Sequence, residues 1–493
     1  MRAGAGASFG RRRGARLASG SEPFVLTAMA SLVGGTVWLY RERELLLGHF
    51  YRPEFLSITH TLTLGWISML MMGVLVRLGP RALGVEIRSR RWLAAQFACM
   101  FVGYTGMVFH FWVSGWVAMA SAAILIVIAA AIQLYNFSGV FRRVRGPDWL
   151  ARYVAAALVH FLLAAILGVL LGFNKVYDVL GGEFFPNIFA HAHLAAVGWV
   201  TMMIVGFEHR LLPSSRPQDR SARGAAARFV LLEVGLVGVV VGLVARSRLV
   251  PLFGALIVAA LAAHAARPLA LLARRKAQDR ATVWATVALL FLLADAAAGL
   301  LLGLDIPGAE SRMRVRVQLA YGYVGLLGWI TLTITALAHK LFPMFVWEER
   351  FGELWGKEPV PAMRDLYSPH LQVLSHSFLA LGIAGTAAAI LAGYLPLITF
   401  FHGMAVIGVA AFVLNFFLMA RWALFRKRFE PTPEDWASFR ANLPNLSVRP
   451  GFSSEPAGGG PACAASPGSS DLPPGPSPSA SRGSSEPGRS ADR

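Results

Sequence analysis

The sequence contains only two cysteines in 493 residues, Cys99 and Cys463, and this scarcity excludes several kinds of site. Two distant cysteines build neither a disulfide framework nor a CxxC zinc site, and the CxxCH motif that attaches haem covalently is absent. Charged residues are also scarce, at 15% of the chain, whereas 56% of the residues are hydrophobic. Any metal or haem must therefore rest on histidine or oxygen ligands.

Long apolar runs fill most of the chain. Many of them reach about 20 residues, the length that an α-helix needs to cross a bilayer. The formal net charge is +19, but lysine and arginine gather in short segments between the apolar runs. This distribution follows the positive-inside rule and does not resemble a nucleic-acid-binding surface. The sequence therefore predicts a polytopic protein of the lipid bilayer that does not bind nucleic acid.

The two ends of the chain differ from its middle. Residues 1–23 are rich in Arg, Gly and Ala, and no small-residue cleavage site separates the next apolar run from a soluble domain. We therefore expect a basic cytoplasmic N-terminus followed by a retained first helix. Residues 430–493 become rich in Pro, Gly and Ser and carry too few apolar side chains for a core. This composition predicts a disordered cytoplasmic tail.

One sequence pattern occurs three times. HTLTLGWISMLMMGVLVRLGP begins at His60, HLAAVGWVTMMIVGFEHRLLP begins at His193, and YVGLLGWITLTITALAHKLFP begins at Tyr323. In each copy a Gly-Trp pair, a basic residue and a proline follow at the same offsets. An internal repeat of this kind indicates three copies of one structural unit.

Hydropathy around each copy predicts four helices per unit. The expected fold class is all-α, a polytopic membrane bundle of twelve transmembrane helices in three pseudo-repeated four-helix units. The membrane domain covers residues 24–424, with units at 24–138, 151–273 and 281–424. Basic clusters follow the second and fourth helix of nearly every unit. They predict a multi-pass protein of a bacterial inner membrane with both termini in the cytoplasm.

Five histidines are expected in the outer third of this membrane domain. His60, His191 and His193 begin helices that run from outside to inside, His110 ends the third helix, and His402 lies near the outer start of the twelfth. Polar groups at membrane depth are costly unless they face the bundle interior. Neutral imidazole is the commonest ligand of haem iron, so all five are candidate cofactor ligands. The alternative is that each one hydrogen-bonds a neighbouring helix.

The spacing of His191 and His193 adds a geometric constraint. Residues two apart on an α-helix point about 200° away from each other. One helix would thus present His191 to one crevice and His193 to another. Because His60 occupies the repeat position of His193, we expect His60 and His193 to be the ligand pair.

Other polar residues in the apolar runs have weaker functional readings. Glu233, Asp295, His160 and His376 are candidates for a proton pathway, since buried carboxylates in bundles often carry protons. Glu233 is also close enough in sequence to Arg228 to pair with it instead.

The remaining histidines have structural interpretations. His209 and His339 adjoin Arg210 and Lys340, so packing at the inner interface is expected, and Glu208 adjoins His209. The Gly-Trp step is expected to let helices pack closely. Loop or helix-end positions are expected for His49, His264 and His370.

The expected twelve-helix architecture over residues 24–424 resembles the catalytic subunit of haem-copper oxidases. The segment AHAHLAAVGWVTMMIVG is similar to the HxH-bearing helix of the cbb3-type oxidase and nitric oxide reductase branch, and THTLTLGWISM resembles its histidine-led helix segments. The resemblance implies a non-covalent b-type haem with His60 and His193 as axial ligands. It leaves His191, His110 and His402 for a second haem, a metal or hydrogen bonds. It further implies an oxidoreductase of respiration, with a quinol or a cytochrome c-type subunit as electron donor.

This chain departs from the family in two places. The family carries HxH on its tenth helix, where this chain has Tyr321 and Tyr323, and its seventh helix carries a histidine pair that binds copper and that this chain lacks. These departures argue against a copper–haem binuclear centre. They suggest a divergent member, closer to haem-binding membrane proteins of the nitric-oxide-response NnrS type.

Two further interpretations stay open from the sequence. The first is a haem-free transporter or channel with the same fold, in which Glu233 and Asp295 would matter more than the histidines. The second is a sensory or assembly factor that binds haem or metal without turnover. Two axial imidazoles saturate haem iron and favour electron transfer. Ligand chemistry would need a second, five-coordinate haem, for which His191 is the first candidate.

Overall fold

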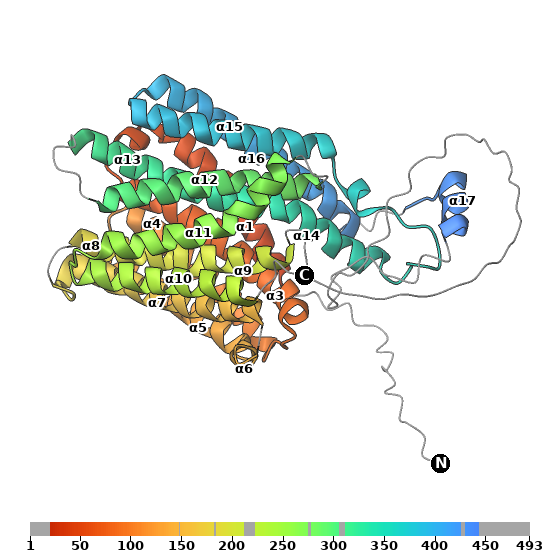
Figure 1. Ribbon diagram of the computed structural model, residues 1–493, viewed down its shortest axis with the longest axis horizontal. Coiled ribbons are helices and arrows are strands. Elements are labelled where there is room, and N and C mark those ends of the chain that lie inside the picture. The colour runs from red at the N-terminus through yellow and green to blue at the C-terminus, as the bar shows by residue number, and fades with distance from the viewer. Residues whose placement is uncertain are drawn as a thin grey trace, which may run out of the picture. The chain divides into compact units, whose positions relative to one another are not determined.

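The computed structural model describes residues 20–146, 148–181, 184–211, 222–274, 278–304, 311–424 and 429–442. Within these ranges the chain is helical and contains no strand. Twelve helices are long and apolar enough to cross a membrane, which confirms the predicted all-α polytopic membrane bundle (Figure 1). Most of the basic N-terminus and residues 443–493 lie outside the described residues, so the predictions made for them stay predictions.

Three of the twelve spans are composite, and the others are single α-helices. The single helices are α1 (Glu22–Arg41), α4 (Arg91–Trp112), α5 (Trp116–Asn136), α7 (Trp149–Tyr177), α10 (Ala222–Val244), α11 (Val250–Ala273), α12 (Arg280–Gly303), α15 (Pro369–Ala392) and α16 (Leu395–Leu424). The predicted units, at 24–138, 151–273 and 281–424, begin and end within two residues of the first and last helices that form them. The fourth helix of each unit packs against the first helix of the next, α5 on α7, α11 on α12 and α16 on α1.

Each composite span is the second helix of its unit, and each contains a π-helical segment of eight residues. The elements are α2 (Pro53–His60), η2 (Thr61–Ser68) and α3 (Met69–Leu83); α8 (Phe184–His193), η3 (Leu194–Thr201) and α9 (Met202–Leu211); α13 (Ser311–Tyr323), η5 (Val324–Thr331) and α14 (Leu332–Phe351). Every π segment starts directly after the first residue of the sequence repeat. A π-helix is rare and often marks a functional site. The sequence predicted helical spans here, which is confirmed, but it did not predict the π segments within them.

Short helices connect or follow the spans: η1 (Arg43–Leu47), α6 (Val140–Arg143), η6 (Met363–Leu366) and α17 (Pro433–Asn442). Disorder was predicted for the segment that forms α17, and that prediction is wrong for these residues. Thr432 Oγ1 accepts from the backbone N–H of Asp435, whose carboxylate accepts from the N–H and hydroxyl of Thr432. With Pro433 in the first turn, this reciprocal capping favours a helix start that composition alone does not reveal.

A ring of hydrogen bonds joins the three π segments at the centre of the bundle. Each indole N–H donates to a hydroxyl of another unit at 3.1 Å: Trp66 to Thr331, Trp199 to Ser68, and Trp329 to Thr201. Each hydroxyl lies two residues after the tryptophan of its own unit, so the three bonds repeat one contact around a pseudo-threefold axis. All six side chains are buried. The three sequence copies are therefore three structural copies closed into a ring.

The glycine of each Gly-Trp pair packs against the first helix of its own unit. A Cβ atom on Gly65 would lie 2.6 Å from Ser31 Oγ, one on Gly198 would lie 2.7 Å from His160 Cβ, and one on Gly328 would lie 2.6 Å from Phe291 Cδ1. These distances leave no room for any side chain. The packing interpretation of the Gly-Trp step is confirmed, with the indole hydrogen bond as an addition that the pattern did not predict.

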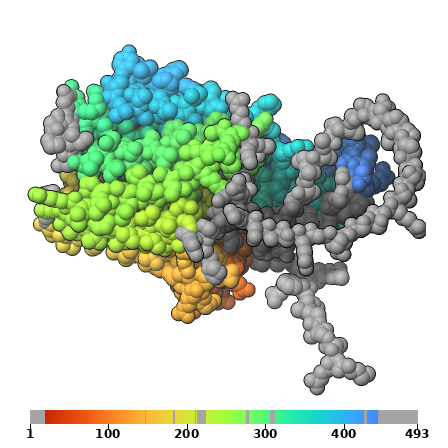
Figure 2. All heavy atoms as spheres, in the orientation of Figure 1, coloured from red at the N-terminus to blue at the C-terminus, as the bar shows by residue number. Residues whose placement is uncertain are grey.

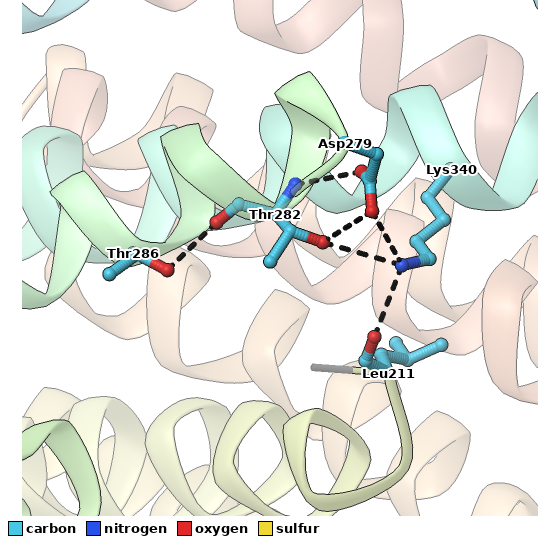
Figure 3. Close-up of polar contacts among 5 residues, drawn as sticks. All are labelled: Leu211, Asp279, Thr282, Thr286 and Lys340. Atoms are coloured by element: carbon cyan, nitrogen blue, oxygen red, sulfur yellow. Dashed lines mark hydrogen bonds and ion pairs between the residues drawn. The ribbon is translucent and has the colours of Figure 1, made fainter. Parts of the chain in front are cut away.

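The basic residue of each repeat lies further along the second helix, and two of the three can be followed in the structure. Arg77 Nη2 of unit 1 donates to Phe345 O of unit 3 at 3.3 Å. Lys340 Nζ of unit 3 donates to Leu211 O of unit 2 at 3.2 Å and to Asp279 Oδ2 at 3.1 Å (Figure 3). The donor of unit 1 thus bonds unit 3, and the donor of unit 3 bonds unit 2. The indole hydrogen bonds join the units in the same order. We call this end of the spans the basic end.

Asp279 caps α12 next to Lys340. From this contact we predict a pH-dependent contribution to the free energy of unfolding. Burial alone would raise the pKa of Asp279, but hydrogen bonds from Thr282 and the charge of Lys340 hold that pKa below its ordinary value. Replacement by asparagine, which can still cap, should lower the free energy of unfolding by less than about 1 kcal/mol, because the pair is half-exposed. Because the folded-state pKa of Asp279 is depressed, the asparagine variant should show its full stability loss at any pH above the ordinary aspartate pKa. The loss should disappear as pH falls through the folded-state pKa. Thermal unfolding in detergent against pH measures it; a loss that is independent of pH would contradict the charge interpretation.

Apolar side chains cover the outward-facing surfaces of the spans. On α10 the exposed large apolar side chains are Val230, Val234, Val237, Val241 and Val244, a spacing of three and four residues that defines one helix face. This helix lies toward the viewer in Figure 2, in yellow-green. Such a stripe is typical of contact with lipid tails, in agreement with a bilayer environment.

Candidate functional site

Three of the five candidate histidines share one hydrogen-bonding arrangement. His60 Nδ1 lies 2.7 Å from Leu56 O, His193 Nδ1 lies 2.7 Å from Phe189 O, and His191 Nδ1 lies 3.0 Å from Ala164 O. A carbonyl oxygen only accepts, so each Nδ1 carries the proton and donates it. This tautomer leaves a lone pair on Nε2. Among the described residues none hydrogen-bonds any of the three Nε2 atoms, and all three side chains are half-buried.

His60 and His191 lie together between unit 1 and unit 2. The imidazole of His60 interacts electrostatically with that of His191. The His60 ring stacks on Phe111 of α4, with centroids 4.8 Å apart. His191 is held against α7 by its hydrogen bond to Ala164 O and by Gly168, where a Cβ atom would lie 2.9 Å from His191 Cε1. Two imidazoles with available Nε2 atoms, one from each unit, therefore lie close enough to interact electrostatically.

This pairing differs from the one that the sequence predicted. His193 was expected to be the partner of His60, because the two share a repeat position. Within the described part of the chain, His193 has no hydrogen bond, ring contact or charge interaction with any other candidate histidine. Equal repeat positions lie at equivalent places in different units, and the histidine that interacts electrostatically with His60 is His191, two positions earlier in the second copy of the repeat.

His402 is engaged at both ring nitrogens. The hydroxyl of Tyr323 donates to His402 Nδ1 at 2.8 Å, and His402 Nε2 donates to Thr36 O at 3.2 Å. In this arrangement neither nitrogen of His402 keeps a free lone pair, which favours the hydrogen-bonding alternative for this histidine over the cofactor-ligand prediction. Tyr323 occupies the repeat position of His60 and His193, so the interface between units 3 and 1 is closed by side chains of the protein itself.

His110 lies at the C-terminal end of α4. Its ring contacts that of its neighbour Phe109, with centroids 5.2 Å apart, and a Cβ on Gly115 would lie 3.3 Å from His110 Nδ1. No interaction among the described residues joins it to the other candidate histidines, so His110 is separate from the His60–His191 pair.

Two of the proton-pathway candidates form a pair. His160 Nε2 of α7 lies 3.3 Å from Glu233 Oε1 of α10. Among the described contacts Glu233 pairs with His160 and not with Arg228, the partner that the sequence offered as an alternative. His160 Nδ1 and Glu233 Oε2 are buried and have no partner among the described residues.

Asp295 lies in unit 3, away from Glu233. A Cβ atom on Gly325 of η5 would lie 3.0 Å from Asp295 Oδ2, and the phenol of Tyr321 interacts electrostatically with this carboxylate. Asp295 Oδ1 is buried without a hydrogen-bond partner in the described structure. Tyr321 of unit 3 occupies the repeat position that His191 occupies in unit 2. A phenol ring in unit 3 therefore takes the place of the imidazole ring in unit 2.

His376 and His339 also meet in unit 3. Their ring centroids are 5.1 Å apart. His376 Nδ1 donates to Gln372 O, His339 Nδ1 donates to Thr335 O, and Asn415 Nδ2 donates to His339 Nε2. His339 was expected at the interface with the headgroups but is buried in the core. His339, the second-helix residue before Lys340, is therefore part of the interior.

Sequence reasoning missed a buried pair between Glu208 and His264. His264 Nε2 lies 2.8 Å from Glu208 Oε2, and both side chains are buried. His264 was expected at a helix end, which is wrong, because α11 continues beyond it to Ala273. The two residues belong to different helices, and no sequence signal beyond their apolar surroundings connects them. His370 at the start of α15 and His49 between η1 and α2 lie where predicted.

Among the described residues, no group of three or more His, Cys, Asp and Glu side chains is arranged to hold a metal ion. A site built only from protein ligands is thus not formed in these ranges, and the donor set at the His60–His191 interface consists of two imidazoles. No protein-family model matches the chain, and no curated protein matches it either. The function therefore rests on the geometry of the chain itself.

Proposed function

We propose that this protein is a haem-binding redox protein of a bacterial respiratory membrane, in which His60 and His191 would hold a non-covalent b-type haem. The observation that carries the proposal is the pair itself. Two imidazoles from different units interact with each other, each has its Nδ1 proton bound to a main-chain carbonyl, and each keeps Nε2 free. Histidines that ligate iron or zinc are held in this way.

The donor set fits haem better than a bare metal ion. A metal ion held by protein alone requires three or four ligands, and the described residues offer no such group. Haem iron receives four ligands from the porphyrin and needs only one or two from the protein. Two imidazoles on facing helices, with the ring of Phe111 against His60, satisfy that requirement.

A cation lies at the same end of the unit 1–unit 2 interface. Lys175 Nζ at the end of α7 is 5.1 Å from the ring centroid of Tyr51, 5.2 Å from that of Trp116 and 4.9 Å from that of Phe184. These rings precede α2 and begin α5 and α8. A b-type haem carries two propionates, and an exposed ammonium group held by aromatic faces is suited to pair with a carboxylate.

Bound haem supplies one-electron redox chemistry. The protein's contribution is to hold both imidazoles as neutral Nδ1–H tautomers through Leu56 O and Ala164 O, which raises the basicity of each Nε2. Because two imidazoles saturate the iron, this site would transfer electrons without binding oxygen or nitric oxide. Electrons would come from a quinol or from a cytochrome c-type subunit.

The wider assignment follows the same reasoning. The proposed relationship is to a divergent branch of the haem-copper oxidases, since α10 carries no histidine that could bind copper. The distribution of basic residues supports a bacterial inner membrane with both termini in the cytoplasm.

Haem content tests the proposal. Protein purified from cells with ample haem supply should yield about one b-type haem per chain in the pyridine haemochrome assay, since the proposal contains one ligand pair. Carbon monoxide should leave the reduced spectrum unchanged, because no iron coordination position is open. A colourless preparation would contradict haem binding and favour a transporter that uses Asp295, whose buried Oδ1 has no hydrogen-bond partner among the described residues. A carbon monoxide adduct of all the haem would contradict two histidine ligands.

A further inference from the structure

An isolated carboxylate lies inside α12, the first span of unit 3. Asp295 is eight residues before Gly303, the last residue of this helix, which is roughly 12 Å along the helix axis. Its Oδ1 is buried without a hydrogen-bond partner, and no lysine, arginine or histidine among the described residues forms an ion pair with it. A charged group at this depth is costly unless something neutralises it. Because the described protein supplies no counter-charge, a proton or a bound cation must do so.

Two glycines leave room around Asp295 and the phenol of Tyr321. A Cβ atom on Gly325 of η5 would lie 3.0 Å from Asp295 Oδ2 and 3.2 Å from Asp295 Oδ1. A Cβ atom on Gly299 of α12 would lie 3.0 Å from Tyr321 Cε2 and 3.3 Å from the Tyr321 hydroxyl. On each of the two helices the glycine is four residues after the polar side chain, so both lie on the same helix face. Each helix therefore makes room for the polar side chain of the other.

The groups at this place are oxygen donors. The carboxylate of Asp295 and the phenol of Tyr321 lie close enough to interact electrostatically. Gly325 leaves its main chain uncovered beside both carboxylate oxygens, and it belongs to the π segment η5. Main-chain carbonyls at interruptions of membrane helices coordinate sodium in transporters. Carboxylate, hydroxyl and carbonyl oxygens are together the ligands that hard cations prefer.

Unit 2 has a nitrogen donor at the equivalent place. There the imidazole of His191 lies against Gly168 of α7, as the phenol of Tyr321 lies against Gly299 of α12. Imidazole suits transition metals such as iron, whereas carboxylate oxygens such as those of Asp295 suit hard cations. Unit 3 is therefore suited to a different ligand from the haem proposed between units 1 and 2.

The charge at this place favours a monovalent cation. Asp295 supplies one negative charge, and among the described residues no group of three or more His, Cys, Asp and Glu side chains is arranged to hold a metal ion. A divalent cation on one carboxylate would keep a net charge inside the bilayer, whereas a monovalent cation forms a neutral pair and costs less. We infer that Asp295 and Tyr321 form a binding site for a small monovalent cation in unit 3, with the uncovered main chain of Gly325 beside it.

Thermal unfolding in detergent tests the site, with NaCl, LiCl, KCl or NH4Cl replacing choline chloride at constant ionic strength. At mildly alkaline pH at least one of these salts should raise the melting temperature of the wild type by at least about 2 °C, in a saturable way. The rise should shrink as pH falls, because protons compete for the carboxylate. Asp295→Asn should lose it, whereas Glu233→Gln should keep it, since Glu233 is an intramembrane carboxylate in contact with His160. Equal melting temperatures in all five salts, or an equal rise in Asp295→Asn and the wild type, would overturn the site.

A pair of glycine variants tests the geometry without changing any charge. Gly325→Ala places a methyl group beside both oxygens of Asp295 and should weaken the affinity for the cation at least about tenfold. Gly322→Ala is the matched control, because no neighbouring atom lies within 4 Å of a Cβ atom at Gly322, and it should keep the wild-type affinity. Isothermal titration calorimetry with the chloride of the cation that stabilises most measures these affinities. Equal affinities of the wild type and Gly325→Ala would overturn the site. Neither experiment requires haem, so a colourless protein that binds the cation would contradict the proposed function and support this site.

Discussion

We expect replacement of His60 or His191 by alanine to remove the low-spin haem spectrum of the proposed site, and replacement of His193 to leave it in place. Each alanine deletes one of the two available Nε2 atoms proposed to hold haem, and one remaining imidazole would hold haem more weakly. His193 makes no contact with this pair among the described residues. Reduced-minus-oxidised absorbance spectra of the purified variants, normalised to protein, measure the effect.

Two outcomes separate this ligand pair from the alternatives. His402→Ala serves as a matched control, since His402 is also a buried imidazole but has both nitrogens engaged by Tyr323 and Thr36. It should retain the haem spectrum. Loss of the spectrum in His193→Ala together with its retention in His191→Ala would restore the pairing that repeat positions alone suggest and would contradict the one proposed from the structure.

Trp199→Ala should destabilise the bundle more than any single hydrogen-bond deletion. The side chain is 1% exposed, its ring stacks on Phe161 with centroids 4.6 Å apart, and its indole closes one third of the tryptophan ring through Ser68. Removing a buried tryptophan costs about 3–5 kcal/mol. Trp199→Phe keeps an aromatic ring but loses the donor, and should cost about 1–3 kcal/mol through the unpaired Ser68 and the smaller ring.

Unfolding in mixed micelles, followed by circular dichroism, measures both losses. Trp92→Ala is the control, because Trp92 is also a tryptophan of a membrane span but is 50% exposed. We expect it to change the free energy of unfolding by less than about 0.5 kcal/mol. Equal stability of Trp199→Ala and Trp92→Ala would mean that the ring at the centre of the bundle does not hold the units together.

Sequence alone predicted the twelve spans and the three units because both depend on local signals. Apolar length defines a span, and the Gly-Trp spacing recurs at fixed offsets. The π segments were not predictable in the same way. Their hydrogen bonds shift by one residue relative to an α-helix, and side chains such as Leu62 and Leu194 fit either form. What favours the π form here is the ring of contacts among three units, which is a tertiary property.

Only part of the candidate site could be predicted from local signals in the sequence. Composition and depth identified His60 and His191 as candidates, but the choice of partner depends on how two units are rotated against each other. His264 and Glu208 lie in different helices 56 residues apart, and only the packed bundle reveals that they meet. His402 was a reasonable candidate until its two hydrogen-bond partners, Tyr323 and Thr36, were located. In each case the decisive information is a contact between helices.

Electron paramagnetic resonance of the oxidised protein tests the pairing of His60 with His191 most directly, because it reports the axial ligands of ferric haem. We expect a low-spin ferric signal typical of two imidazole ligands in the wild type and in His193→Ala, and conversion to a high-spin signal, or loss of signal together with haem, in His191→Ala. A wild-type protein that shows only high-spin ferric haem, or a His191→Ala variant with an unchanged low-spin signal, would contradict a haem held between these two histidines.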